Sequence, residues 1–225
     1  MPVGLPRSRG GVPRRGAVGK SAARAPAARA ASAFGAAYFR KFYVEPATRV
    51  VTQAEMRARA RLIAAVLAQA GLPVRSIIDV GCGMGLLQKP FAKELPRARY
   101  VGLEASEYLC NRYGWTRGSV IDYAPRKPSD LAVCYDVLQY LGDRNAARAI
   151  DNLARLTRAA LYVSALTEED WRENCDRSRT DRAVHLRSGN WYRRRLKKNF
   201  RYLGFGVWLR KEVTAILWDL ERAPD

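Results

Sequence analysis

The sequence predicts an α/β fold, with a mostly parallel sheet, helices on both faces and a C-terminal antiparallel hairpin. Three observations support this class. Short apolar runs alternate with longer segments of helical periodicity between residues 52 and 163. The first of these runs, at 76–80, leads directly into a glycine-rich loop. Near the C-terminus the alternation stops, and two apolar runs follow one another across a short polar link.

The expected elements follow from the first helix onward. Thr52-x-x-Glu55 is a capping box, and it precedes apolar residues at helical spacing that end at Gly71. The continuous apolar run at 131–134 is typical of a central parallel strand. The expected strands are 76–80, 99–104, 120–122, 131–134 and 160–163, and the expected helices between them are 85–95, 106–113 and 143–157.

The C-terminal part of the chain has a different organisation. A polar segment at 167–190 precedes a strongly basic helix, expected at about 190–199. Two apolar runs, 205–209 and 213–218, are joined by the polar residues 210–212. This arrangement predicts two antiparallel strands at the end of the sheet.

Composition separates an N-terminal extension from a single domain. The formal net charge of the 225 residues is +19, and residues 1–44 hold nine Lys or Arg and no acid. Residues 1–33 consist mostly of Ala, Arg, Gly, Pro and Ser, so they bury too little apolar surface to offset the entropy of ordering. We therefore expect a disordered basic extension at 1–33 and one domain at 34–225.

Several classes of protein are disfavoured. No run approaches the ~18–20 apolar residues of a membrane span, and the N-terminus lacks the apolar core of a secretory signal. The four cysteines and the single histidine lack zinc-ligand spacing, so we expect no metal site and a reducing compartment. The Ala- and Arg-rich start is typical both of an organellar transit peptide and of a bacterial extension, and we favour the cytoplasm.

The most informative motif is Asp79-x-Gly81-x-Gly83-x-Gly85, at the end of the first strand. Glycine allows positive φ and close approach of a ligand to the backbone. Glu104 lies 19 residues past Gly85, at the end of the second strand, where nucleotide-binding βαβ units place a ribose-binding carboxylate. The spacing resembles the first motif of class I S-adenosylmethionine (SAM) methyltransferases. The resemblance covers roughly residues 50–222 and implies the Rossmann-like sheet of that family.

The resemblance implies a role for each motif residue. Asp79 would support the loop and the methionine part of SAM, the glycines would let the backbone approach the cofactor, and Glu104 would accept hydrogen bonds from the ribose hydroxyls. Near the adenine, either Asp122 or Ser119 with Val120 is expected. The cofactor-binding residues expected in all are Asp79, Gly81, Cys82, Gly83, Gly85, Glu104, Asp122 and Tyr135.

The sequence says less about the part of the site that would bind the methyl acceptor. In the family, the segment after the fourth strand, 135–140, borders the methyl group, and Asp136 is one candidate catalytic residue. His185, the only imidazole, is the other, as a general base. We expect 167–201 to form a lid whose arginines, 193–195, favour an anionic or polar small molecule.

The function that these features favour is transfer of a methyl group from SAM to an oxygen, nitrogen or carbon of a small molecule. Two alternatives remain open. The basic and aromatic residues of 172–212 are compatible with an RNA methyltransferase. A non-catalytic binding module with the same fold is the third reading.

Overall fold

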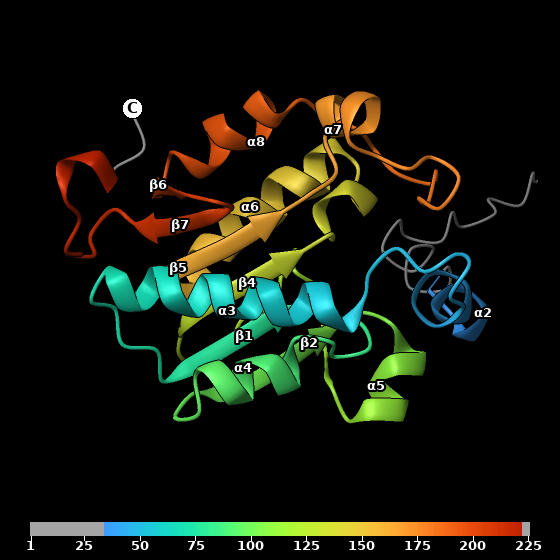
Figure 1. Ribbon diagram of the computed structural model, residues 1–225, viewed down its shortest axis with the longest axis horizontal. Helices are drawn as coiled ribbons and strands as arrows, with labels where there is room; N and C mark the ends of the chain where they lie inside the picture. The colour runs from blue at the N-terminus through green and yellow to red at the C-terminus, as the bar shows by residue number, and fades with distance from the viewer. Residues whose placement is uncertain (1–33, 222–225) are drawn as a thin grey trace, which may run out of the picture.

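The computed structural model describes residues 34–221, and the expected disordered extension, 1–33, lies outside them. Its seven-stranded sheet has the order β3-β2-β1-β4-β5-β7-β6 (Figure 1). β7 runs antiparallel to both of its neighbours, and the other pairs are parallel. The strands are β1 (Ser76–Val80), β2 (Arg99–Glu104), β3 (Thr116–Arg117), β4 (Ser129–Tyr135), β5 (Thr157–Ser164), β6 (Phe200–Gly204) and β7 (Val207–Arg210). The predicted fold class is therefore confirmed.

Helices precede and connect the strands. The predicted capping box is present at the start of α3, where the amide of Glu55 donates to Oγ1 of Thr52 and the Thr52 amide donates to the Glu55 carboxylate. No helix within residues 34–221 is both long and apolar enough to cross a membrane. The helices are α2 (Ala36–Phe39), the π-helical turn η1 (Arg40–Val44), α3 (Gln53–Gln69), α4 (Gln88–Glu94), α5 (Glu107–Tyr113), the short η2 (Leu138–Tyr140), α6 (Asp143–Leu156), α7 (Glu168–Glu173), α8 (Gly189–Leu196) and η3 (Asp219–Glu221).

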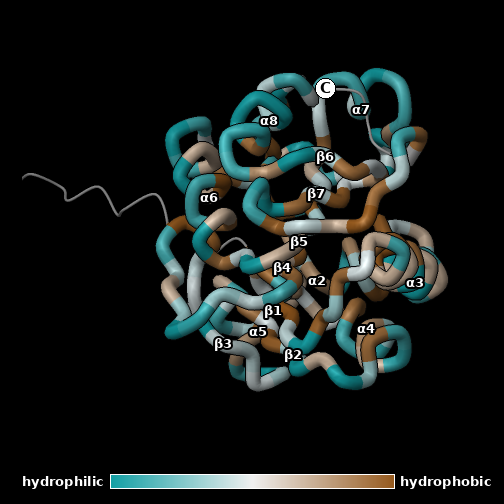
Figure 2. Tube along the Cα trace, turned by 90° about the vertical axis from the view of Figure 1, so that its left-hand side faces the viewer, coloured by the Kyte–Doolittle hydropathy of each residue, from teal (hydrophilic) through white to brown (hydrophobic). Residues whose placement is uncertain are grey.

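The core has two layers, one on each face of the sheet. Alternate residues of β1 point to opposite faces, so Ile77 packs with α3 and α4 whereas Ile78 packs with α6 and α8. Figure 2 shows α6 and α8 on one side of the sheet and α3 and α4 on the other. This three-layer arrangement leaves the carboxyl ends of the parallel strands free to carry a site.

One predicted strand is wrong. Residues 120–122 form a turn, and the edge strand β3 lies a few residues earlier. The carbonyl of Ser119 accepts hydrogen bonds from the amides of Asp122 and Tyr123, and the Ser119 hydroxyl accepts one from Ile121. These local hydrogen bonds satisfy the backbone of the segment within itself, so it does not pair with β2.

The C-terminal hairpin exists, and the predicted strand 205–209 overlaps β7, but the partner strand, β6, precedes β7 and does not follow it. The predicted basic helix ends at Leu196, and the turn of the hairpin is at 204–206, where Gly204, Phe205 and Gly206 all have positive φ. Residues 213–218, predicted as the second strand, are not a strand and pass the end of α3, where the Ile216 amide donates to the Ala70 carbonyl. The turn, which requires positive φ, therefore determines where the two strands of the hairpin lie, and the apolar pattern does not.

Candidate functional site

The glycine loop follows β1 at the point where the sheet order changes direction. β1 lies between β2 and β4, which are reached by connections on opposite sides, and ligands of α/β proteins bind at such a crevice. Gly81, Gly83 and Gly85 have φ of 69°, 55° and 72°. All three positions therefore require the left-handed conformation that glycine adopts without strain.

The three glycines nevertheless differ in their surroundings. A Cβ atom at Gly81 would lie 2.4 Å from Cγ2 of Val137, and one at Gly85 would lie 2.5 Å from the Trp115 ring. A Cβ atom at Gly83 would have no neighbour within 4 Å. Gly81 and Gly85 thus permit close internal packing, whereas a side chain at Gly83 would enter open space.

Glu104 is directly connected to this loop. The carboxylate is 7% exposed, and its Oε2 accepts the Gly83 amide at 2.8 Å. Its Oε1 accepts the amides of Ala105 and Ser106 at 2.8 and 2.9 Å. Three backbone amides therefore hold an acidic side chain at the end of β2, on the wall of a pocket.

That pocket has a volume of about 150 Å³. Gly81, Gly83 and Glu104 line it on one side, and residues 118–121 line it on another. Of the two groups expected near an adenine, Ser119 and Val120 lie in this pocket. The structure places Asp122 outside it, in a separate surface hollow with residues of α6 such as Asn152 and Arg155, because the 119–123 turn directs Asp122 away from the strand ends.

Asp79 and Cys82 lie beneath the loop. Together with Gly83, Met84 and Tyr135 they line a smaller recess of about 40 Å³. Asp79 is 3% exposed, and burial raises the pKa of its carboxyl to about 7, although the Tyr100 hydroxyl donates to it at 2.5 Å. Burial likewise raises the pKa of the Cys82 thiol, so this residue stays a neutral side chain at ordinary pH.

A second, larger cavity of about 570 Å³ adjoins the first pocket. Four residues line both: Tyr38, Tyr43, Asp136 and Tyr140. The hydroxyl groups of Tyr38 and Tyr140 lie 2.8 Å apart. Figure 1 shows α2 and the segment after α7 at the carboxyl ends of the strands, and both supply residues to this cavity.

Asp136 occupies the junction of the two spaces. It is one of two non-glycine residues with positive φ in the described chain, at 54°, and its amide donates to the Ser164 carbonyl at 3.0 Å. Burial raises the pKa of its carboxyl, and hydrogen bonds from Tyr135 and Gln139 and the charge of Arg59 partly oppose that increase. A strained acidic residue at a pocket junction is typical of a functional position.

The other predicted acceptor-side residues lie elsewhere. His185 is exposed and lines neither space, although its amide donates to the Gln139 carbonyl at 2.7 Å. None of the arginines 193–195 lines the cavity either, and the Arg195 guanidinium lies 3.6 Å from the centre of the Trp191 ring. Residues of the expected lid do line the cavity, but they come from 170–184.

The sequence interpretation missed several lining residues. Arg49, Arg59 and Arg179 come from three separate segments, and no spacing links them. Tyr38 and Tyr43 belong to an aromatic-rich stretch whose density was the available signal. That stretch contains Phe34, Tyr38, Phe39, Phe42 and Tyr43.

Comparison with known proteins indicates which class of enzyme this chain resembles. Residues 78–159 match the model of a family described as a methyltransferase domain. A comparison with curated protein sequences found no match. The resemblance read from the glycine loop is thus confirmed: residues 78–159 are similar to a methyltransferase domain, and class I enzymes of this kind take SAM as their cofactor.

Solved structures share the fold at low sequence identity. Magnesium protoporphyrin IX methyltransferase from Synechocystis PCC 6803, solved with bound SAM, has a TM-score of 0.59 at 17% identity, covering 85% of this chain and 100% of its own. DesVI from Streptomyces venezuelae has a TM-score of 0.52 at 16% identity, covering 69% of this chain and 91% of its own. A putative methyltransferase of Haloferax volcanii, in complex with the activator Trm112, has a TM-score of 0.51 at 15% identity, covering 66% and 72%.

Proposed function

We propose that this protein transfers a methyl group from SAM to a nucleophilic oxygen, nitrogen or carbon of a small molecule. The observation that supports this proposal most directly is that two pockets lie next to each other. The pocket over the glycine loop and the 570 Å³ cavity share Tyr38, Tyr43, Asp136 and Tyr140. A cofactor in the first and an acceptor in the second would meet at these residues.

The first pocket suits SAM in its chemistry. Open space at Gly83 allows a ligand to approach the backbone, and the Glu104 carboxylate has enough lone pairs to accept a further hydrogen bond beside its three amides. Ser119, Val120 and Ile121 offer a mixed polar and apolar wall for a base. When bound, SAM supplies a methyl group already activated on a sulfonium.

The protein's own contribution would be alignment, exclusion of water and proton transfer. Alignment of two reactants can supply much of a barrier reduction. The rings of Tyr38, Tyr43 and Tyr140 surround the junction and limit water there. The Asp136 carboxylate stands at the same place and would accept a proton from a hydroxyl or ammonium acceptor.

Two observations support a small acceptor over RNA. The cavity is enclosed partly by 38–51 and by 170–184, and the basic side chains of α8 lie outside its lining. In addition, the Synechocystis enzyme is named for a small molecule, magnesium protoporphyrin IX. Both observations support this cavity as the acceptor site.

Calorimetry with SAM and gel retardation with RNA test the proposal together. We expect stoichiometric SAM binding and only weak RNA binding that disappears with added salt. Failure to bind SAM would favour the hypothesis that the protein is a non-catalytic binding module with the same fold. Tight, sequence-dependent RNA retention at physiological salt would favour the RNA methyltransferase.

A further inference from the structure

Two residues that line the same cavity each carry a buried polar atom without a partner. Among the described residues, only two buried side-chain nitrogen or oxygen atoms lack a hydrogen-bond partner: Oε1 of Gln139 and Nε of Arg179. Both residues line the 570 Å³ cavity. A buried polar group without a partner is costly, so such groups point to a ligand that satisfies them. The two atoms have opposite requirements, because Oε1 needs a donor and Nε needs an acceptor.

Gln139 lies in η2, next to Tyr140, which lines both the cavity and the pocket over the glycine loop. Its side chain is 4% exposed, and its amide group donates to the Asp136 carboxylate. That hydrogen bond determines the amide orientation, because the reverse orientation would place two acceptors together. Oε1 of Gln139 and the carboxylate of Asp136 therefore form a pair of acceptors beside the junction.

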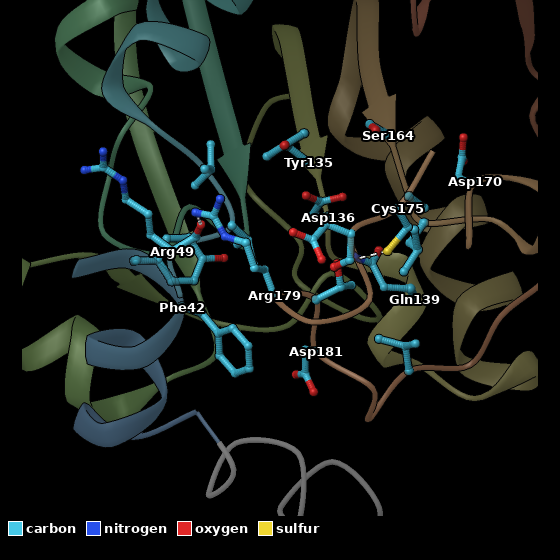
Figure 3. A pocket seen from close by; sticks show the side chains of 18 of the residues that line it. Phe42, Arg49, Tyr135, Asp136, Gln139, Ser164, Asp170, Cys175, Arg179 and Asp181 are labelled. Atoms are coloured by element: carbon cyan, nitrogen blue, oxygen red, sulfur yellow. Dashed lines mark hydrogen bonds between the residues drawn. The ribbon is translucent and has the colours of Figure 1, made fainter. Parts of the chain in front are cut away.

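Arg179 lies in the loop after α7. One of its terminal nitrogens donates to the Arg49 carbonyl, which leaves the Nε hydrogen without a partner. Arg49 also lines the cavity, as does Arg59, which donates to the Tyr162 hydroxyl at 2.8 Å and stacks on the Tyr135 ring. In the view of Figure 3, Asp136 lies between Arg179 and Gln139.

The other acidic residues that line the cavity accept hydrogen bonds from groups nearby in their own segments of the chain. Glu55 and Asp170 accept hydrogen bonds within the capping boxes of α3 and α7. Asp176 accepts from the amide and hydroxyl of Ser178, and Asp181 accepts from the Ala183 amide. Asp136 is therefore the carboxylate placed to meet an acceptor at the cofactor end.

The charge and ring content of the lining favour a cationic group at that end. Five carboxylates and three guanidinium groups line the cavity, so its formal charge is negative. Tyr38, Tyr43 and Tyr140 surround the junction, and aromatic faces attract ammonium groups. Arg179 would then receive an oxyanion on the side of Asp136 away from Gln139, since its planar fork suits a carboxylate.

We propose that the acceptor is a small amino carboxylate, with its amine against Gln139 and Asp136 and its carboxylate against Arg179. This inference rests on the proposed function, because it assigns the substrate class of the same site. It replaces the expectation that arginines 193–195 select the acceptor, since those residues lie outside the cavity.

A panel of paired compounds tests the inference. The probes are amino carboxylates of increasing separation between amine and carboxylate, each with its carboxamide and its N-acetyl derivative. Transfer of labelled methyl from SAM is measured, and mass spectrometry locates the product. We expect at least one amino carboxylate to exceed its carboxamide about 10-fold or more in kcat/KM, and the N-acetyl derivatives to be inactive.

Two variants test which residue binds the carboxylate of the acceptor and which residue binds its amine. Arg179→Met should remove the preference for carboxylate over carboxamide, and Gln139→Leu should lower kcat/KM for both compounds about equally, by roughly 10-fold. Arg177→Met is the matched control, because Arg177 is exposed on the same loop and does not line the cavity. SAM affinity should be unchanged in all three.

The outcomes separate the two proposals. SAM binding without methylation of any amine in the panel, or methylation with no preference for the carboxylate, would overturn the inference and leave the proposed function standing. Absence of SAM binding would overturn the proposed function itself. Loss of the carboxylate preference in Arg177→Met as well as in Arg179→Met would also contradict the assignment.

Discussion

The backbone amide of Gly83 donates a 2.8 Å hydrogen bond to Oε2 of Glu104. This contact joins the loop after β1 to the end of β2, and the same carboxylate also accepts the amides of Ala105 and Ser106. Glu104 therefore has a structural role in addition to the proposed ribose contact, and its replacement should affect both.

Glu104→Ala is expected to weaken SAM binding and to lower the melting temperature. Loss of hydrogen bonds to a charged acceptor costs about 1.5–3 kcal/mol, or roughly 10- to 150-fold in affinity. Calorimetry and thermal melting measure the two effects. Glu107→Ala, at an exposed position on α5, is the control, and unchanged SAM affinity in Glu104→Ala would refute the ribose assignment.

Gly83→Val is expected to abolish SAM binding, because its side chain would enter the space that the cofactor needs. Gly114→Val is a matched control, since Gly114 also has positive φ, 71°, and open space around its Cβ position, but lies at the end of α5. Both variants should lose similar stability. Equal SAM affinity in the two variants would show that Gly83 does not face the cofactor.

Asp79→Asn should change how stability depends on pH. The folded pKa of about 7 lies above the usual value of 3.8, so the folded state binds the proton more tightly. The wild type should therefore lose stability relative to the variant as pH rises through this window and reach a constant difference above it, at about 1.4 kcal/mol per pKa unit. Thermal melts of both proteins across the window check this, and parallel curves would contradict it.

Asp136→Asn should lower turnover about 100-fold or more, a larger effect than any change in SAM affinity, because proton transfer typically contributes 10²–10⁴ in rate. Since burial raises the pKa of Asp136, the wild-type rate should fall as pH falls through that raised value. The variant should lack this acidic limb. Asp122→Asn, in the separate hollow, should behave as wild type, and a normal rate in Asp136→Asn would exclude proton transfer by this residue.

The strands and the glycine loop of the candidate cofactor pocket agree with the prediction because their signals in the sequence are local. The bounds of β1 and β2 agree with the expectation, and the three glycines have the positive φ that their spacing implies. The turn at 119–123 was missed because a serine hydroxyl and carbonyl compete with strand pairing, which hydropathy does not report.

The acceptor cavity could not be predicted in the same way. Arg49, Arg59 and Arg179 meet through long-range packing of three segments, and no periodicity connects them. The same limit applies to arginines 193–195, whose clustering in sequence suggested a binding role. The fold places α8 against α6, away from the strand ends, so those side chains do not line the cavity.

A crystal structure with S-adenosylhomocysteine would show directly whether the cofactor binds beside the glycine loop and next to the large cavity. We expect the ribose hydroxyls at Glu104, the adenine beside Ser119–Ile121 and the sulfur facing Asp136 at the junction with the large cavity. Binding of the ligand at another site, or with its sulfur directed away from Asp136 and the cavity, would contradict both the cofactor site and the acceptor site proposed for this protein.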